Sequence, residues 1–406
     1  MKYEPMHKIY YKQPVEWLRI LDNRRNSECS ISLPIPIHEY NRRNAYGAFF
    51  MYHPVLVTLL LSLEGKRSAF ITLVSEVPTV LISHVINAFL STEIKASNDI
   101  EGVYSSRREI QEAIQNIEND KLRFSSIISK YKAILENPHD FTFESSPDIR
   151  ALFEDIISSE IDDKNQPDGV VFRRDSVDIV NHQGKVIHRG TLPESHIIQE
   201  MDQALAVLND EMLVLPIRVA LFHYYFGYIH PFYDGNGRTN RFISTAYLAK
   251  YFHPLVALRL SAVINNNKKE YYDAFKMTTA EINGGDLTYF IIAFISLIEK
   301  TIDNATELLN KRINRLSEEK QKLEQFFSTN EITDPLLREI YILLLQARLF
   351  SLGVGISKAE IMNACGKSRG TIFTRFKQIP KDHLIKVKYG RTESYMLKTS
   401  ILDSKE

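Results

Sequence analysis

The chain has 406 residues, of which 44% are hydrophobic and 25% charged, as in ordinary globular proteins of more than one domain. Its 50 basic and 50 acidic side chains cancel, which excludes a whole-protein field that attracts nucleic acid or an anionic membrane. Cys29 and Cys365 form neither a metal-ligand spacing nor a disulfide framework, and the N-terminus lacks the apolar core of a secretory signal, so a cytoplasmic setting is expected.

The N-terminal region, residues 1–90, contains an uncharged stretch from Ala45 to Leu63 that is about long enough to cross a bilayer. His53 and Pro54 interrupt its centre, and no strongly basic flank anchors one side. We therefore expect buried core elements here and no membrane partner. The segment from Ile31 to Ile37, with two prolines, is expected to be an extended edge.

Helical patterns dominate from Val55 onward. Arg108 to Ile134 is expected to be one long helix that ends before Asn137 and Pro138, and the polar span from Asp162 to Asp168 a loop. Two short β-rich runs with a polar turn between them then predict a β-hairpin. The runs are Val177, Asp178, Ile179 and Val180, followed by Lys185, Val186, Ile187 and His188, and the turn is Asn181, His182, Gln183 and Gly184.

Helical patterns return from Pro193 to Tyr228 and from Pro254 to Lys300. Residues 301–330 are expected to be a helical linker in which leucine or isoleucine recurs every seven positions. Arg312 and Glu319 interrupt the second apolar position of the repeat, which disfavours a sustained coiled coil. A homodimer through this helix is left open. The recurring residues are Ile302, Leu309, Leu316 and Leu323.

The last segment, residues 331–406, shows three helices and two strands. The helices are expected at Pro335 to Ala347, Lys358 to Ala364, and from the N-cap Ser368 to Ile379. Residues 384–387 and 394–397 are β-rich and flank Gly390. This order predicts a winged helix-turn-helix module.

The densest cluster of chemically informative residues runs from Ile229 to Arg241. Gly235 and Gly237 allow backbone N–H groups to approach a ligand closely. If a helix begins at Arg238, those groups lie at its positive end, where anions bind. Arg238 and Arg241 are three residues apart and share a helical face, so the cluster predicts a polyphosphate cradle.

Two further residues of this cluster suggest chemistry rather than binding alone. Asp234 would repel phosphate unless a cation lay between them, so it is the candidate ligand for Mg²⁺. His230 is the group whose ordinary pKa lies nearest neutrality, so it is the candidate general base.

The segment from His230 to Arg241 matches the signature His-Pro-Phe-x-(Asp/Glu)-Gly-Asn-Gly-Arg-x-x-Arg at every specified position. The chain therefore resembles the Fic family over a core of about residues 91–300. The resemblance implies a mainly α fold, a Fic-type helical bundle with a small β-hairpin flap, to which this chain adds its C-terminal winged helix-turn-helix.

The same resemblance implies transfer of AMP from ATP to a Ser, Thr or Tyr hydroxyl of a protein, which could include the chain itself. His230 would act as the base and Asp234 would hold Mg²⁺. The hairpin would dock the target segment along its open edge. The residues implied for ATP are Gly235, Asn236 and Gly237 for the inner phosphates, Arg238 and Arg241 for the outer ones, and Tyr272 as a wall for the base.

An inhibitory motif of the family, (Ser/Thr)-x-x-x-Glu-(Gly/Asn), is matched by Ser97 to Gly102 in a helix expected at about residues 91–105. Ser97 and Glu101 are four apart and share one helical face, and Gly102 can end the helix. The resemblance implies that Glu101 reaches Arg241 and blocks productive ATP binding, as in the N-terminally inhibited class.

Two alternatives remain open. In the first, Glu101 positions a water that removes AMP from a modified protein. In the second, the chain is a DNA-binding regulator that acts through residues 331–406. Its DNA contacts would be Arg369, Thr371, Arg375 and Lys377 on the recognition helix, with Lys386, Lys388 and Arg391 on the wing.

Overall fold

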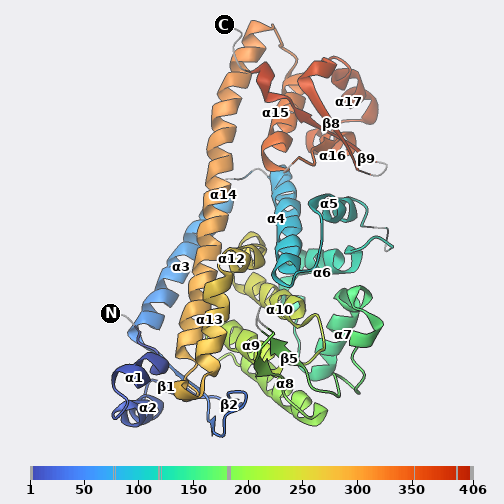
Figure 1. Ribbon diagram of the computed structural model, residues 1–406. Coiled ribbons are helices and arrows are strands. Elements are labelled where there is room, and N and C mark those ends of the chain that lie inside the picture. Colours follow the sequence, from blue (N-terminus) through green and yellow to red (C-terminus); the bar gives the residue numbers. More distant parts are fainter. Residues whose placement is uncertain are drawn as a thin grey trace. The chain divides into compact units, whose positions relative to one another are not determined.

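The computed structural model of this mainly helical chain describes residues 3–75, 77, 79–117, 119, 121–180, 184–351, 353–389 and 392–402 (Figure 1). The chain divides into two compact units, each built from three segments. The first unit is Met1–Ser68, Ala96–Tyr104 and Ser129–Ile302, and the second is Ala69–Lys95, Ser105–Ile128 and Asp303–Glu406.

Four helices contribute residues to both units. They are α3 (Pro54–Ser75), α4 (Thr79–Ile100), α6 (Ser125–Glu136) and α14 (Thr288–Thr329).

The first unit holds the motif and most of the short elements. Its N-terminal part contains α1 (Met6–Lys12), α2 (Trp17–Arg25), β1 (Ser30–Ser32), β2 (Ile37–His38), β3 (Ala45–Tyr46) and β4 (Phe49–Met51). Its remaining elements are η1 (Pro138–Asp140), α7 (Ser146–Ile156), η2 (Ser158–Glu160), η3 (Asp163–Asn165), β5 (Asp178–Val180), β6 (Val186–Arg189), α8 (Glu194–Asn209), α9 (Leu215–Ile229), α10 (Asn236–Tyr251), α11 (Pro254–Ala257), α12 (Leu260–Asn266), α13 (Lys268–Thr279) and η4 (Glu281–Asn283).

Helix α9 lies between α8 and α10 in the first unit, and nearly every residue of α9 and α10 is buried. A helix that is enclosed on all sides belongs in a core. The packing is close: a Cβ on Gly227 of α9 would lie 2.8 Å from Cε1 of Phe275. Because both helices are enclosed, the loop between them, residues 230–235, is held firmly at its two ends.

Three small antiparallel sheets accompany these helices: β1 pairs with β4, β2 with β3, and β5 with β6. The hairpin prediction is therefore confirmed for the described strands, although Asn181, His182 and Gln183 of its turn lie outside the described residues. The predicted extended edge from Ile31 to Ile37 contains most of β1 and the first residue of β2.

Some helices predicted as continuous are divided. The prediction of one helix from Arg108 to Ile134 is wrong, because α5 (Arg107–Gln115) ends well before α6 begins and Phe124 adopts a left-handed conformation with φ 71°. The run from Pro193 to Tyr228 is likewise two helices, α8 and α9. Pro216 lies in the first turn of α9, where its missing N–H costs no helical hydrogen bond. Pro254 to Lys300 contains α11 to α13 and the start of α14.

The second unit contains α5 and all elements after α14: α15 (Pro335–Phe350), β7 (Ile356–Ser357), α16 (Lys358–Cys365), α17 (Arg369–Phe376), η5 (Lys381–His383), β8 (Leu384–Tyr389), β9 (Thr392–Leu397) and η6 (Thr399–Ile401). The three strands form a sheet in the order β7-β9-β8, and α15 packs on β9. Ser368 caps α17 by accepting a hydrogen bond from the Thr371 N–H at 3.3 Å. The helices and strands lie where the sequence predicts them, and the winged-helix assignment stays a prediction; Gly390 and Arg391 lie outside the described residues.

The recurring apolar residues from Ile302 to Leu323 are buried within the chain. Among the described residues, no helix combines the length and the apolar character that a bilayer crossing requires. The stretch from Ala45 to Leu63 contains β3, β4 and the start of α3.

Candidate functional site

The motif loop joins two enclosed helices through two left-handed residues. His230 follows the last turn of α9 with φ 53°, and Gly235 precedes α10 with φ 79°. Helix α10 begins at Asn236, two residues before the predicted Arg238. The first N–H groups of a helix have no partner within the helix, so those of α10 are available to an anion at the loop.

Packing and side-chain hydrogen bonds hold this loop in place. Phe232 is fully buried and stacks on Phe153 with ring centroids 4.0 Å apart. Asn236 accepts from the Phe232 N–H at 2.9 Å and donates to the Phe232 carbonyl at 2.7 Å. The Asn236 side chain thus fixes the loop, and its contact with phosphate stays a prediction.

Arg241 is fully buried and makes three hydrogen bonds to the segment predicted to be inhibitory. Its Nε donates to Ser97 Oγ at 3.0 Å and its Nη2 to the Ser97 carbonyl at 2.9 Å. Its Nη1 donates to Glu101 Oε1 at 2.8 Å. Burial disfavours the charged guanidinium, but the Glu101 carboxylate together with Tyr271 and Tyr272 outweighs this and raises the pKa of Arg241. The structure therefore brings Arg241 to Ser97 and Glu101, which precede it by 144 and 140 residues in the sequence.

The Glu101 carboxylate also occupies space at the glycine turn. A Cβ on Gly237 would lie 1.9 Å from Glu101 Oε1, so the carboxylate lies directly over this backbone. Helix α4 ends just before Glu101, and Gly102 adopts φ 72° while the Val103 N–H bonds to the Asn98 carbonyl at 2.9 Å. This left-handed glycine after the last helical turn is a common helix end and directs Glu101 toward the motif.

Arg238 lies in the same first turn of α10 and is 3% exposed. Its Nη1 pairs with Glu160 Oε2 at 3.2 Å, and its Nη2 lies 3.8 Å from Asp234 Oδ1. The sequence indicated the arginine but not Glu160, because no local pattern links a residue of η2 to the motif 78 residues later.

His230, the predicted general base, lies in an enclosed setting. Its Nδ1 lies 3.4 Å from the Gly227 carbonyl, so a proton on Nδ1 would leave the Nε2 lone pair available. Burial lowers the pKa of His230 to about 4, and nearby His188 contributes in the same direction. The ring is therefore neutral at physiological pH, whereas an ordinary histidine is partly protonated there.

This low pKa predicts an unusual pH profile. General-base catalysis needs the neutral imidazole, and kcat/KM reports the pKa of the free enzyme. For a Glu101→Gly protein, we expect kcat/KM for AMP transfer to stay level as the pH falls through about 6.5 and to decline only below about pH 5. ATP binding measured over the same range separates titration of the nucleotide from that of His230. A half-maximal value near pH 6.5 with constant ATP binding would contradict the assignment.

Arg173, which the sequence did not single out, donates hydrogen bonds to the backbone at the start of the motif loop. It is fully buried, and burial lowers its pKa to about 10. Its guanidinium donates to four backbone carbonyls: those of His230 at 2.9 Å, Asp175 at 2.7 Å, Thr191 at 3.0 Å and Ile229 at 3.4 Å. Arg173 and Arg174 are adjacent, so in the sequence both look like exposed cations. Only the fold shows that Arg173 is buried and Arg174 exposed.

Loss of this guanidinium should destabilise the protein. Arg173→Met leaves buried carbonyls without donors, and hydrogen bonds to charged groups are each worth about 1.5–3 kcal/mol. We expect the thermal midpoint to fall by about 5 °C or more. Arg174→Met, at the exposed neighbouring position, is the matched control and should leave the midpoint nearly unchanged. Equal midpoints for the two variants, measured by differential scanning calorimetry, would refute this role.

Ser244, His223 and Tyr271 form a network of hydrogen bonds between neutral groups near Arg241. Ser244 donates to the Asn240 carbonyl at 2.8 Å, so its oxygen accepts from His223 Nδ1, also at 2.8 Å. His223 Nε2 then accepts from the Tyr271 hydroxyl at 2.7 Å. Burial, followed by the charge of Arg241, lowers the pKa of His223 well below its ordinary value, which keeps the ring neutral.

Tyr272, the predicted wall of the base pocket, is 49% exposed. Burial and then Glu101 raise its pKa, whereas Arg241 lowers it, so the side chain lies within electrostatic reach of the anion site. Its role toward the base stays a prediction.

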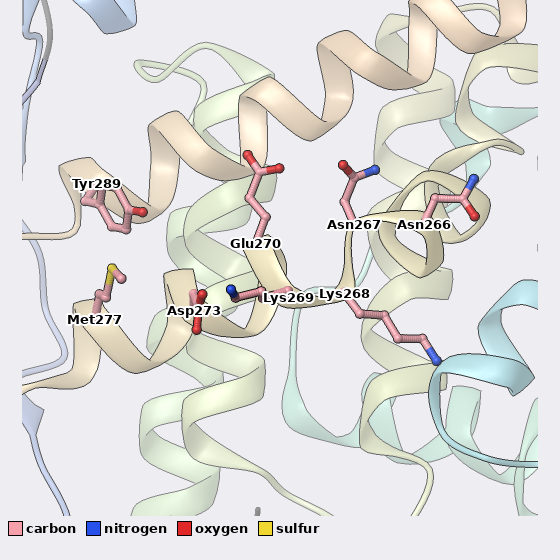
Figure 2. A pocket seen from close by; sticks show the side chains of 8 residues that line it. All are labelled: Asn266, Asn267, Lys268, Lys269, Glu270, Asp273, Met277 and Tyr289. Atoms are coloured by element: carbon pink, nitrogen blue, oxygen red, sulfur yellow. The ribbon is translucent and has the colours of Figure 1, made fainter.

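A separate open pocket of about 430 Å³ lies where the start of α13 meets α14 (Figure 2). Lys268 extends away from the other residues that line the pocket, and its Nζ donates to the Asp99 carbonyl at 2.9 Å, which connects α13 to the end of α4. The pocket is lined by Asn266, Asn267, Lys268, Lys269, Glu270, Asp273, Met277 and Tyr289.

Asp234 provides a carboxylate, the kind of ligand that Mg²⁺ prefers, as its predicted role requires. Its side chain is 47% exposed at the edge of the loop and accepts the Gly235 N–H. Among the described residues, no group of three or more His, Cys, Asp or Glu side chains is arranged to hold a metal. Mg²⁺ is commonly held by one or two carboxylates together with phosphate oxygens, so a single Asp234 suits a metal that arrives with a nucleotide.

The hairpin predicted as the flap is anchored to α9. His188 Nε2 donates to the Tyr228 carbonyl at 2.6 Å, and Arg189 pairs with Asp178 across the strands at 2.6 Å. Val180 and Ile187 are exposed. Lys185 precedes β6, and Val177 accepts the Gly190 N–H at 3.1 Å. Target docking along this two-stranded sheet stays a prediction.

Two cations of the predicted DNA surface have acidic partners within the second unit. Arg375 pairs with Asp334 and Lys386 with Glu393, both at 2.6 Å. Arg369, Lys377 and Lys388 are exposed, and Thr371 is half-buried. DNA binding stays a prediction.

Residues 143–248 match the model of the Fic/DOC family. The chain is 33% identical over 112 residues to "Protein adenylyltransferase Fic" of Nematostella vectensis, which covers 26% of this chain and 24% of that protein. It is 29% identical over 181 residues to the Drosophila melanogaster protein of the same name, covering 43% of this chain and 34% of that one. The chain thus matches about a third or less of the length of these relatives.

Among solved structures, the fold is similar to that of a Fic family protein from Desulfovibrio desulfuricans, with a TM-score of 0.50 and 19% identity. The match covers 86% of this chain and 97% of that one. This similarity supports the fold across most of the chain.

Proposed function

We propose that this chain, whose residues 143–248 form a Fic/DOC family domain, transfers AMP from ATP to a hydroxyl of a protein and is restrained by Glu101. The names of the similar proteins support the reaction class. The observation that carries the proposal is the anion site itself. Two buried guanidiniums and the start of α10 converge on a glycine turn beside His230, and a carboxylate of the chain already lies there.

The residues support a direct displacement. The target hydroxyl oxygen bonds to the α-phosphorus, the bond from that phosphorus to the bridging oxygen breaks, and pyrophosphate leaves with the electron pair. The hydroxyl proton passes to Nε2 of His230, which is neutral and ready to accept it. Arg238, Arg241 and the N–H groups of Gly235, Asn236 and Gly237 stabilise the charge on the phosphates.

Mg²⁺, when bound at Asp234, neutralises phosphate charge.

The low pKa of His230 has a consequence for the mechanism. A weakly basic imidazole drives proton transfer less strongly, so positioning and charge stabilisation carry most of the rate enhancement. The proposal includes ATP as the nucleotide, Mg²⁺ as the metal and a protein as the substrate. It also includes modification of the chain by itself and formation of a homodimer.

The test is incubation of a cell lysate with the Glu101→Gly protein, ATP and Mg²⁺, followed by mass spectrometry for AMP on Ser, Thr and Tyr. A second reaction with Glu101→Gly/His230→Asn protein is the blank. Modified peptides that require His230 support the proposal. AMP-modified protein that only the wild type demodifies would favour the removal reaction instead.

A further inference from the structure

Glu160 lies in a segment that packs directly on the motif turn. A Cβ on Gly235 would lie 2.6 Å from Ile157, 3.1 Å from Phe153 and 3.6 Å from Ile161, so the residues around η2 leave no space there. Side chains packed this closely have little freedom to move. The position of Glu160 is therefore set by the same contacts that shape the loop.

The pair between Glu160 and Arg238 is almost fully removed from water. The two side chains are 9% and 3% exposed, and Nη1 lies 3.2 Å from Oε2. Among the described residues, Arg238 Nε is buried without a hydrogen-bond partner. The guanidinium thus retains donor capacity for a ligand, although its charge is balanced by Glu160.

Both guanidiniums of the anion site therefore face a carboxylate from outside the motif, Arg241 that of Glu101 and Arg238 that of Glu160. The two carboxylates differ in one respect. Glu101 lies over Gly237 and takes space that a phosphate needs. No Glu160 atom is among the three atoms nearest to a Cβ placed on Gly237. Glu160 can act through its charge while it remains in place.

We propose that Glu160 sets the affinity of this site for polyphosphates by neutralising Arg238, independently of the block that Glu101 imposes. The inference rests on the proposed function for its ligand, ATP. A buried arginine without a counter-ion is costly, so Glu160 stabilises the site without ligand. When a triphosphate binds Arg238, the same carboxylate becomes a like charge in a poorly solvated place and weakens binding.

Glu160→Gln isolates this electrostatic effect, because the amide oxygen still accepts from Arg238 while the charge is removed. In the Glu101→Gly protein, we expect Glu160→Gln to lower the Kd for ATP about tenfold, which corresponds to about 1.4 kcal/mol. The gain for AMP should be smaller, since AMP carries less charge to Arg238. Isothermal titration calorimetry with ATP and with AMP measures both.

Glu154→Gln is the matched control. Glu154 lies on α7, is 55% exposed and pairs with Arg150 at 2.7 Å, so the substitution changes net charge equally without touching the motif. It should change the Kd for ATP by less than about twofold. Glu160→Asp keeps the charge but withdraws it by one methylene, and we expect a gain smaller than that of Glu160→Gln. This second variant covers the case in which Glu160→Gln fails to fold.

An unchanged or weaker affinity for ATP in Glu101→Gly/Glu160→Gln protein overturns the inference, because a residue that only supports Arg238 would give this result. The outcome is separable from that of the proposed function. AMP transfer with an unchanged Kd overturns the inference alone, whereas a tenfold tighter Kd without AMP transfer to any protein supports the inference and overturns the proposed reaction.

Discussion

Replacing Glu101 with glycine is expected to raise the initial rate of AMP transfer at saturating Mg²⁺ by at least about tenfold, equivalent to about 1.4 kcal/mol of the barrier. In the wild type, the Glu101 carboxylate holds Arg241 and covers Gly237, so ATP must displace it or bind in another pose. Arg241 is buried, so removing its carboxylate partner is costly unless another anion takes its place, and the phosphate of ATP supplies one.

A graded series tests this explanation. Glu101→Gln removes the charge but keeps the bulk, so it should give a smaller increase than Glu101→Gly. Ser97→Ala removes one of the three contacts that hold Arg241 and should give the smallest increase. The rate of AMP transfer from radiolabelled ATP and the Kd for ATP are measured for each variant, and together they test whether the Glu101 carboxylate restrains the reaction. If wild type and Glu101→Gly bind ATP and transfer AMP equally, the carboxylate is no brake.

Replacing His230 with asparagine in the Glu101→Gly protein should lower the rate of AMP transfer by about 10²- to 10⁴-fold, the usual contribution of a positioned general base. Asparagine is the appropriate substitute because His230 has φ 53°, a left-handed conformation that asparagine tolerates better than alanine. The loop should therefore keep its shape, and the Kd for ATP should change little.

His196→Ala is the control for the loss of a histidine in the same unit, since His196 is exposed on α8. It should leave the rate unchanged. Transfer by the His230→Asn protein within about tenfold of its parent, with ATP binding intact, would exclude His230 as the base.

Local patterns in the sequence contained most of the candidate chemistry. The residues from His230 to Arg241 are consecutive, so their spacing alone predicts a glycine turn, an anion-binding helix start and two guanidiniums on one face. The contact of Ser97 and Glu101 with the motif was also predictable from local sequence, because a four-residue spacing and a terminal glycine determine which way these two side chains point. The hairpin and the elements after Pro335 follow from equally local signals.

Breaks within helical patterns were less predictable. The local sequence did not reveal that α5 ends at Gln115 and α8 at Asn209, because apolar residues at helical spacing continue beyond both positions. Phe124, just before α6, shows why such a break is hard to predict. Its backbone has φ 71°, and a phenylalanine adopts this conformation only when the packing around it demands it.

Only the tertiary structure decided the electrostatics of the site. Glu160 and Arg173 carry no motif and lie 78 and 57 residues from their partners, yet the fold pairs one with Arg238 and the other with the His230 carbonyl. Burial likewise changed the predicted base from a group that titrates near neutrality to one with a pKa of about 4. The physical reason is common to all three. Sequence spacing determines which side chains a single helix or turn presents, whereas desolvation and long-range ion pairing depend on which segments the folded core brings together.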